Sequence, residues 1–407
     1  MKIFIGTSEI AGMLTFVADA YRVLGHDVTT CVNNFGKTFY NQSYDIILNK
    51  QILPEGVSQP MIDRVCRKVN RMYQSRLREQ AFKLHRDLHD VYIFIWNGFN
   101  TDSTADYEYL KKKGKKIVSI FCGSEVRHIS AFTQEYGLDV SIWERWFHEM
   151  DINDPLFRIR KAELYSDAIF SVPDQAGLSI RPYHKIYIPF LTSSIEPIYP
   201  AREVPKLVHI PSMRGIKGTT YVVEAVNRLK QEGLAFEFEF ISGVANQVVL
   251  EKLRDADILV DELFLHGPGT LSLEGMASGC AVATKTIKGE VYDGVVCNVN
   301  PENVYSQIKR LISDYDYRQR IAIEGRRLIE ILNEPTRIAA DILNKALRGP
   351  NTKSDFDYYP RFFSDQYELP ENAVVSARNK GLSRQVIEKF GLDATLNIQR
   401  MRDQKLI

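Results

Sequence analysis

The stretch 266–284, HGPGTLSLEGMASGCAVAT, has a composition and spacing suited to binding a phosphate. It predicts a short helix with Thr270 as its N-cap and Gly279 just beyond its end, followed by a buried strand over Ala281–Thr284. A helix that begins in this way presents unpaired N–H groups and the positive end of its dipole to a ligand. The loop before the helix contains Gly267, Pro268 and Gly269.

Glu274 lies one turn into this helix, where its carboxylate is placed to accept hydrogen bonds from two hydroxyl groups, such as those of a ribose. Phosphate donors and a diol acceptor on one helix indicate a nucleoside diphosphate as the ligand. The alternative interpretation is an ordinary exposed acid near the start of a helix. His266 also has two interpretations: a donor to a sugar or phosphate, or a histidine at the end of a strand.

A second candidate phosphate site is PSMRGIKGTT, residues 211–220. Arg214 and Lys217 supply a planar guanidinium and a point charge three residues apart, and together these suit a diphosphate. Ser212 adds a hydroxyl group. The order Lys-Gly-Thr is not that of a P-loop, and the dinucleotide fingerprint GxGxxG occurs in neither half of the chain. The alternative is a solvated basic turn at the start of a helix.

Strand and helix patterns alternate in two separate series. The first begins with a strand at Lys2–Gly6 and a helix over Met13–Leu24, and the second with a strand at Leu207–Ile210. Such alternation predicts α/β architecture with parallel sheets covered on both faces. Ligands of these sheets bind in the loops after the strands. The chemically unusual loops of this kind are 6–12, 211–219 and 266–270.

Length and proline content predict two domains. A chain of 407 residues exceeds the usual size of one compact domain, and the proline-rich stretch near 186–206 separates the two series. We predict two doubly wound Rossmann-like domains that face each other across a cleft, with a helical C-terminal tail. The predicted segments are an N-terminal domain at 1–190, a linker at 191–206, a C-terminal domain at 207–345, and an extension at 346–407 that packs back on the N-terminal domain.

Charge and composition limit the classes of partner and compartment. A net charge of +1 creates no overall field that favours nucleic acid. The sequence shows no signal peptide and no apolar run of transmembrane length. Five cysteines, odd in number and without CxxC spacing, favour reduced thiols in the cytoplasm over disulfides or a zinc site.

Together these motifs resemble the retaining nucleotide-sugar glycosyltransferases of family 4, which have the two-domain glycosyltransferase-B fold and act in bacterial polysaccharide and cell-envelope assembly. The similarity covers most of the chain. It is strongest in VHIPSMRGIKGTTYVVEAVNRL and DADILVDELFLHGPGTLSLEGMASGCAVAT, and it extends to MKIFIGTSEIAG and KKIVSIFCGSEVRH. The KGT loop and the LEGMASG helix are specific when they occur together.

The resemblance implies a role for each candidate residue. Arg214 and Lys217 would face the pyrophosphate as catalytic groups, His266 would lie near the transferred sugar, and Glu274 would hold the ribose hydroxyls. The amides at the helix start would contact the distal phosphate and stabilise the charge that develops on it. The remaining donor-binding residues are Gly12, which lets the backbone approach the phosphate, Ser212, Ser242 and Gly243 near the base, Gly267, and the helix-start residues Gly269, Thr270 and Leu271.

The resemblance further implies a UDP-hexose donor, a saccharide or lipid-linked acceptor, and retention of anomeric configuration. It implies no metal and no cofactor, because the cations and the helix end neutralise the leaving diphosphate. Two positions depart from the family pattern: His266 replaces a glutamate, and Cys122 replaces a frequent histidine. Glu125, Arg127 and His128 follow Cys122 closely; they either substitute for that histidine or lie at the surface.

Two segments of the first half concern the acceptor. Asn97 and Gly98 follow an apolar strand and are either acceptor-loop residues or an ordinary strand-end turn. Residues 61–89 predict a basic amphipathic helix. This helix either lies on the anionic inner face of the cytoplasmic membrane or packs on the core with a solvated basic face.

Three functions follow from these observations. The leading hypothesis is a nucleotide-sugar-dependent glycosyltransferase. A nucleotide-sugar epimerase of the same fold also cleaves the anomeric C–O bond, but it needs acids near the glycosyl carbon, and His266 stands where a glutamate would be. The third is a degenerate transferase that binds nucleotide or polysaccharide as a scaffold.

Overall fold

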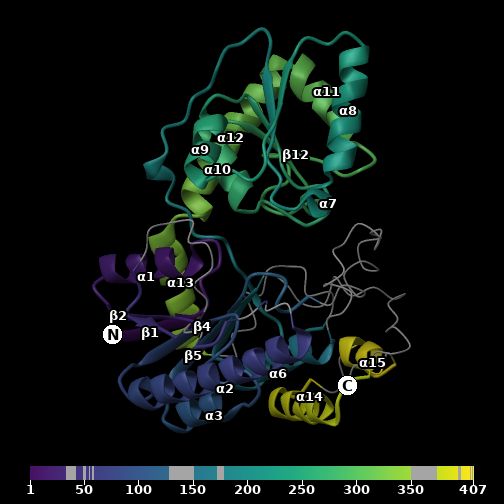
Figure 1. Ribbon diagram of the computed structural model, residues 1–407. Coiled ribbons are helices and arrows are strands. Elements are labelled where there is room, and N and C mark those ends of the chain that lie inside the picture. The colour runs from purple at the N-terminus through teal and green to yellow at the C-terminus, as the bar shows by residue number, and fades with distance from the viewer. Residues whose placement is uncertain are drawn as a thin grey trace. The chain divides into compact units, whose positions relative to one another are not determined.

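The computed structural model contains two compact units (Figure 1). The first unit holds the described residues of 1–127, 151–187 and 336–407, and the second holds 188–335. His128 lies outside the described residues. The residues that the structure describes are 1–33, 43–48, 52–54, 56, 59–127, 151–171, 178–349, 374–392, 396–403, 405 and 407.

The first unit is built on a parallel sheet that, within the described residues, has seven strands in the order β3-β2-β1-β4-β5-β6-β7. The chain passes from β1 to β2 and β3 on one side of β1. It then returns to β4 on the other side, so the direction of the connections reverses at β1. The strands are β1 (Lys2–Thr7), β2 (Asp27–Val32), β3 (Ile46–Ile47), β4 (Val91–Ile95), β5 (Lys116–Phe121), β6 (Ala168–Ser171) and β7 (His184–Lys185).

Alternation along β1 shows how the sheet is covered on both faces. Ile3 and Ile5 belong to one apolar cluster with α1 and α13, whereas Phe4 between them belongs to a second cluster with α2 and α3. Successive strand side chains point to opposite faces, so this pattern produces three layers. The helices of this unit are α1 (Met13–Val23), α2 (Pro60–His85), α3 (Ala105–Lys112), α6 (Asn153–Tyr165), α13 (Pro335–Arg348), α14 (Ala377–Phe390) and α15 (Leu396–Asp403).

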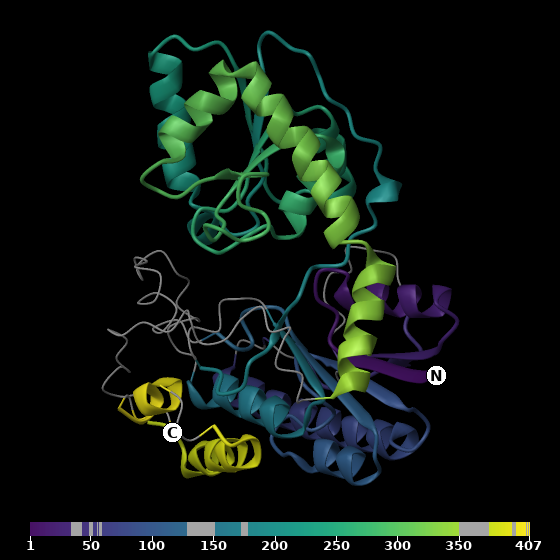
Figure 2. The same ribbon diagram turned by 180° about the vertical axis from the view of Figure 1, so that it is seen from behind.

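The C-terminal boundary of the second unit lies at Pro335, the first residue of α13, and not at the predicted residue 345. From Thr336 onward this helix belongs to the first unit, and both views show it beside α1 (Figures 1 and 2). The reason is its apolar stripe: Ile338, Ile342 and Ala346, spaced by four residues, are buried in the cluster that contains α1. The sequence therefore crosses back to the first unit ten residues before the predicted point.

The C-terminal extension contributes α14, which packs against α6. The Arg160 guanidinium, fully buried on α6, donates from Nε to Ser383 Oγ at 2.8 Å, and Asn379 Nδ2 donates to the Asn153 carbonyl at 3.0 Å. Buried polar contacts of this kind stabilise one register of the two helices. The described part of the extension is thus a helical element of the first unit.

The second unit has its own parallel sheet, with the described strands in the order β12-β11-β10-β8-β9. The strands are β8 (Lys206–His209), β9 (Glu237–Phe240), β10 (Ile258–Val260), β11 (Ala281–Thr284) and β12 (Cys297–Asn298). The helices are α7 (Arg214–Lys217), α8 (Thr219–Gln231), α9 (Asn246–Arg254), α10 (Thr270–Ser278), α11 (Val304–Ser313) and α12 (Tyr315–Leu332), with a 3-10 turn η2 at Thr192–Ser194.

Helices cover both faces of this second sheet. The buried residues of α8 and α11 form one cluster with Leu207, Ile258 and Ala281 of the strands. On the opposite face, α10 approaches closely at Gly275, where any side chain would meet Leu259. Figure 1 shows α8 and α11 on one side and α9 and α10 on the other. The unit is therefore a second three-layer α/β structure with its own core.

The predicted linker 191–206 packs on the second unit. Arg326 of α12, 7% exposed, donates from its guanidinium to the carbonyl oxygens of Ile195 at 2.9 Å and Thr192 at 3.1 Å. A bidentate guanidinium fixes both position and orientation of the segment it binds. Within the described residues, no helix has the length and apolar character required to cross a bilayer.

Candidate functional site

The strand order of the second sheet determines where its ligand site lies. β8 leads through α7 and α8 to β9 on one side, whereas β10 pairs with β8 on the other. Neighbouring parallel strands whose connections leave in opposite directions create a crevice beyond their carboxyl ends. The loops at that edge are 210–213, 241–245 and 261–269. Every predicted donor-site residue except Gly12 lies in these loops or in the helix that follows each.

The start of α10 differs by one residue from the prediction. Gly269, and not Thr270, is the N-cap, with φ −86° and ψ −176°, and no described side chain caps the helix. The extended backbone at Gly269 places Thr270 inside the helix, and the first intrahelical bond runs from Leu273 N to the Gly269 carbonyl at 3.0 Å. The N–H groups of Thr270 and Leu271 therefore have no acceptor within the helix and are oriented toward the loop edge.

The end of α10 confirms the predicted role of Gly279. This residue has φ +94°, and a Cβ atom there would collide with the backbone carbonyl oxygen of Ile198. The neighbouring Ile198 N–H donates to the Ser278 carbonyl at 3.0 Å, so the segment cannot move away without losing that bond. Only glycine combines this conformation with this contact. The position of α10 in the unit thus depends on one residue at its C-terminus.

Glu274 is buried and is not the exposed acid of the alternative interpretation. Its residue is 4% exposed, and Asn246 Nδ2, at the start of α9, donates to Oε1 at 2.8 Å. Burial raises the pKa of the Glu274 carboxyl to about 7; the hydrogen bond from Asn246 opposes the shift, and the charge of Asp261 adds to it. A buried carboxyl with a single described hydrogen bond and a pKa this high is typical of a ligand-binding group.

Lys217 lies between two carboxylates that the sequence analysis did not identify. Its Nζ is 2.7 Å from Asp261 Oδ1 and 3.0 Å from Glu262 Oε2. Burial alone lowers the pKa of Lys217, but the attraction of Asp261 and Glu262 is stronger and raises the pKa overall. Burial raises the pKa of Glu262, although Lys217 opposes that shift. The signal in the sequence was the pair of acids that ends the apolar strand, in ILVDE.

Asp261 connects the two predicted phosphate-binding helices. It is 1% exposed, and its second oxygen, Oδ2, accepts the Ser272 hydroxyl of α10 at 2.6 Å while Oδ1 contacts Lys217 of α7. One buried carboxylate therefore holds the lysine and the first turn of α10 in fixed relation. Within the described ranges, no group of three or more His, Cys, Asp or Glu residues is arranged to hold a metal ion.

Arg214 and Ser212 lie at the solvent-facing side of the same edge. Both are exposed, and the Arg214 guanidinium lies 5.0 Å from the centre of the Phe240 ring at the end of β9. Gly218 ends α7 with φ +72°, and a Cβ atom there would meet the Leu263 side chain at 2.8 Å. The KGT loop is thus held close to the β10 loop by a glycine, and this brings Arg214 and Lys217 to one site.

The other predicted residues of the second unit occupy two loops. His266 is half-buried, and Gly267 donates from its backbone N–H to the Lys285 carbonyl at 2.7 Å, which ties this loop to the end of β11. Ser242 and Gly243 lie exposed in the loop after β9. The structure therefore brings the predicted donor-site residues of the second unit to one edge of one sheet, in three consecutive loops and the helices that follow them.

Gly12 lies in the first unit, where it is the N-cap of α1 with φ +81°. The N-terminus of this helix is occupied by the protein itself, because the Glu9 carboxylate accepts the backbone N–H groups of Leu14 at 3.3 Å and Thr15 at 3.1 Å. The same carboxylate accepts the Thr15 hydroxyl at 2.7 Å. A carboxylate in this position satisfies the amides and the dipole that would otherwise bind an anion.

The candidate acceptor residues have the geometry of a strand-end turn. Asn97 is buried, its side-chain oxygen accepts the Gly98 N–H at 2.8 Å, and its carbonyl accepts the Thr7 hydroxyl at 2.9 Å. Cys122 is half-buried, and its backbone N–H donates to the Glu125 carboxylate. Burial raises the pKa of the Cys122 thiol well above its usual value, which favours the neutral thiol.

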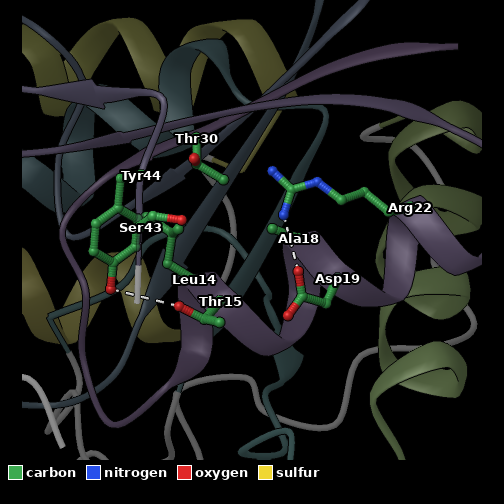
Figure 3. A pocket seen from close by; sticks show the side chains of 8 residues that line it. All are labelled: Leu14, Thr15, Ala18, Asp19, Arg22, Thr30, Ser43 and Tyr44. Carbon is green, nitrogen blue, oxygen red and sulfur yellow. Dashed lines mark hydrogen bonds and ion pairs between the residues drawn. The ribbon is translucent and has the colours of Figure 1, made fainter. Parts of the chain in front are cut away.

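A hollow of about 200 Å³ in the first unit is lined by residues of α1, of β2 and of the segment before β3 (Figure 3). Arg22 and Asp19 form an ion pair of 2.9 Å at one end, and the hydroxyls of Thr15 and Tyr44 lie 3.5 Å apart at the other. None of the predicted site residues lines it. The lining residues are Leu14, Thr15, Ala18, Asp19, Arg22, Thr30, Ser43 and Tyr44.

Comparison with known proteins gives a match in structure only. No protein-family model matches the sequence, and no curated protein matches it. Sucrose-phosphate synthase from Thermosynechococcus elongatus superposes with a TM-score of 0.57 at 12% identity, over 86% of this chain and 98% of that chain. A trehalose-6-phosphate synthase gives 0.53 at 10% identity, over 85% and 99%. HepE from Anabaena, in complex with UDP-glucose, gives 0.51 at 10% identity, over 85% and 99%.

These solved structures are similar to the chain along nearly their whole length, and so the similarity includes both units and not one shared domain. The two parallel sheets, each covered by helices on both faces, agree with that comparison. The chain therefore has the two-domain, Rossmann-like glycosyltransferase-B fold that the sequence analysis predicted.

Proposed function

We propose that this protein is a glycosyltransferase that uses a nucleotide-sugar donor, and that the donor diphosphate binds at the carboxyl edge of the second sheet. The observation that carries the proposal is that three features meet at the switch point of the second sheet. These are the N-terminus of α10, the two basic side chains of α7, and the buried Glu274 carboxyl of α10. The glycosyltransferase-B fold supports it, because the proteins with similar structures include two sugar-phosphate synthases and a protein complexed with UDP-glucose.

Each group has a distinct part in this proposal. The N–H groups of Thr270 and Leu271 bind the distal phosphate, where negative charge grows as the glycosidic bond breaks. Arg214 and Lys217 neutralise the diphosphate as a leaving group, so no metal is required. Glu274, as a carboxylate, accepts the two ribose hydroxyls. The base lies near Ser242 and Gly243, in the loop after β9.

The second unit is a better donor site than the first for a physical reason. Both units place a helix N-terminus at the switch point of a parallel sheet, and only an unoccupied one attracts a phosphate. In the first unit Glu9 fills the start of α1, whereas no described side chain caps α10. The first unit is therefore left for the acceptor, a saccharide or lipid-linked saccharide.

We take UDP-hexose as the donor and retention as the stereochemical outcome. The donor assignment rests on the family resemblance and on the UDP-glucose complex of HepE. Retention fits the loop after β1, where the acid nearest the strand, Glu9, is engaged by the start of α1 and is not placed as a base. The anomeric configuration of an isolated product, determined by NMR, tests this assignment; an inverted product contradicts it.

The rate of UDP release tests the proposal in a variant whose substitution does not disturb the fold. Arg214 is exposed, so Arg214→Ala removes a diphosphate contact without leaving a buried group unpaired. We expect UDP release from UDP-glucose to fall by about 100-fold, as for other contacts strengthened in the transition state. Arg254→Ala, which removes an exposed arginine of α9, is the matched control and keeps wild-type turnover. Equal rates in both variants contradict the site.

The same assay separates the competing functions. A scaffold binds UDP and releases none from UDP-sugars, with or without acceptor. An epimerase inverts one carbon of the sugar, and its product is again a sugar nucleotide. The composition of the sugar-nucleotide pool therefore changes without transfer to an acceptor. A transferase releases UDP in proportion to the new glycoside. A panel of UDP-hexoses with saccharide acceptors, analysed by mass spectrometry, distinguishes these outcomes.

The helix α2 supports contact with an anionic membrane. Few of its residues are buried, and its outer side exposes apolar residues: Met61 is 81% and Val65 is 56% exposed. Arg64, Lys68 and Arg71 lie exposed between and beside them. A helix with exposed apolar residues flanked by cations lies at the surface of an anionic bilayer. The core-packed interpretation of residues 61–89 accounts for the buried side of the helix only.

Vesicle binding tests the membrane contact directly. We expect the protein to sediment with phosphatidylglycerol vesicles at low ionic strength and to remain in solution with phosphatidylcholine vesicles. Val65→Gln weakens that binding, whereas Val23→Gln, at a 77% exposed position on α1 of the same unit, leaves it unchanged. Binding that is independent of lipid charge, or equal loss in both variants, contradicts the proposal.

A further inference from the structure

Lys217 and the two carboxylates that contact it carry more negative than positive charge before any ligand binds. Lys217 contributes one positive charge, and Asp261 and Glu262, at 2.7 Å and 3.0 Å from its Nζ, contribute two negative charges when both are ionised. Asp261 is 1% and Glu262 5% exposed, so water screens these charges poorly. A diphosphate that contacts this lysine therefore approaches a buried group with a net charge of −1.

The two carboxylates are not equivalent in their contacts. Asp261 uses both oxygens as acceptors, one for Lys217 and one for the Ser272 hydroxyl at 2.6 Å. Glu262 accepts the Leu265 N–H through Oε1 at a longer 3.3 Å and contacts Lys217 through Oε2. Asp261 thus supplies the two short bonds that hold α7 and α10 together, and neutralisation of Glu262 leaves both of them in place.

The charged groups around Glu262 come from three elements. Lys217 faces it from α7, Asp261 precedes it in the same loop, and Lys285 at the end of β11 interacts with it electrostatically. His266 follows in the same loop, and Glu274 is near Asp261 on α10. Burial raises the pKa of Glu262, which favours its neutral form, and Lys217 opposes that shift.

We propose that binding of a diphosphate at Lys217 is coupled to the uptake of one proton by Glu262. The inference rests on the proposed donor site. In the free protein Lys217 is shared by two carboxylates; once Glu262 is neutral, the lysine keeps its bond to Asp261 and directs its remaining N–H donors to the phosphate. Asp261 is then the positioning residue of the site, and Glu262 is the residue that adjusts its charge to that of the ligand.

Proton uptake is measurable without any assumption about the sugar or acceptor. Inorganic pyrophosphate is the first probe, because it lacks the ribose that Glu274 would bind, and UDP is the second. Each is titrated calorimetrically into the whole protein in buffers of equal pH and different ionisation enthalpy; the slope of heat against ionisation enthalpy gives the number of protons exchanged. Comparison of Glu262→Gln with wild type cancels the ionisation of the ligand itself.

We expect wild type to take up close to one proton more than Glu262→Gln when pyrophosphate binds. We also expect the affinity of wild type for pyrophosphate to fall with rising pH, by up to about tenfold per unit, and that of Glu262→Gln to fall less. Glu302→Gln, at an exposed glutamate of the same unit, behaves as wild type. Asp261→Asn retains the extra proton uptake but binds pyrophosphate more weakly, because Lys217 loses its fixed position.

Two results overturn the inference, and they differ from failure of the proposed function. If wild type and Glu262→Gln bind pyrophosphate with equal proton exchange, Glu262 does not adjust the charge of the site. If Asp261→Asn loses the proton uptake and Glu262→Gln keeps it, the proton resides on the other carboxylate. If neither UDP nor pyrophosphate binds wild type at millimolar concentration, the donor site itself is wrong and the coupling falls with it.

Discussion

Replacement of Glu274 by glutamine tests whether this buried acid is retained for function. Burial is the main cause that raises its pKa in the folded protein to about 7, from the ordinary value of 4.5. Because the folded state binds this proton more tightly than the unfolded state, ionisation of Glu274 destabilises the fold as pH rises from about 4.5 to 7. Glutamine keeps the acceptor for Asn246 and removes the charge.

The magnitude follows from the difference between the two pKa values. Each unit corresponds to about 1.4 kcal/mol, so ionised Glu274 costs the folded state about 3 kcal/mol at pH 8 and less than about 1 kcal/mol at pH 5. Solvent screens this charge little, because the residue is 4% exposed. Glu274→Gln is thus expected to stabilise the protein, and to do so by about 2 kcal/mol more at pH 8 than at pH 5.

The assay is urea unfolding at both pH values, combined with UDP binding by thermal shift. We expect the variant to be more stable than wild type at pH 8 and to show no increase in midpoint with UDP, whereas wild type shows one. Glu302→Gln, at an exposed position, changes neither property. A Glu274→Gln variant that is less stable than wild type at pH 8, or that still responds to UDP, refutes the reasoning.

Three further predictions concern Lys217, the glycine at the end of α10, and the basic face of α2. Lys217→Ala lowers the rate of UDP release by about 100-fold to 1000-fold, and a rate within threefold of wild type contradicts its placement at the diphosphate. Gly279→Ala lowers the unfolding free energy by about 2 kcal/mol more than Gly233→Ala does in chemical denaturation, because both glycines have positive φ but only Gly279 faces a backbone oxygen; equal losses contradict this. Arg64→Glu with Lys68→Glu abolishes sedimentation with phosphatidylglycerol vesicles at low salt, and unchanged sedimentation excludes α2 as the membrane contact.

Much of the fold was predictable because its strands are strongly apolar. The predicted strand Ala281–Thr284 is observed with the same ends, and the predicted Leu207–Ile210 is displaced by one residue to Lys206–His209. Buried parallel strands give continuous apolar runs bounded by glycine and polar residues, which a single sequence shows clearly. The two-domain fold followed from the repetition of that pattern.

The return of the chain to the first unit was not predictable from local pattern. The helix α13 has an apolar stripe at Ile338 and Ile342, which indicates a buried face but not which core receives it. Both units offer a sheet face that needs a helix, and the choice depends on tertiary packing. The boundary was therefore predicted at 345, near the end of this helix, and not at its start.

The residues of the candidate site could be predicted from the sequence, but the charged partners of Lys217 could not. Glycines and helix signals identified the loops that hold Arg214, Lys217 and Glu274. The partners of Lys217 were missed because Asp261 lies 44 residues away from it in sequence and Glu262 one residue further. Both meet the lysine only through the pairing of β8 with β10. Pairwise contacts across parallel strands leave no short-range signal.

Hydrogen exchange with and without saturating UDP, followed by mass spectrometry, tests the central claim most directly. It locates the nucleotide in the chain without requiring turnover or a known acceptor. We expect slowed exchange in peptides that cover 211–219 and 266–279, which contain the KGT loop and the start of α10. Protection confined to the first unit, or measurable UDP binding with no protection in either of those segments, would contradict it.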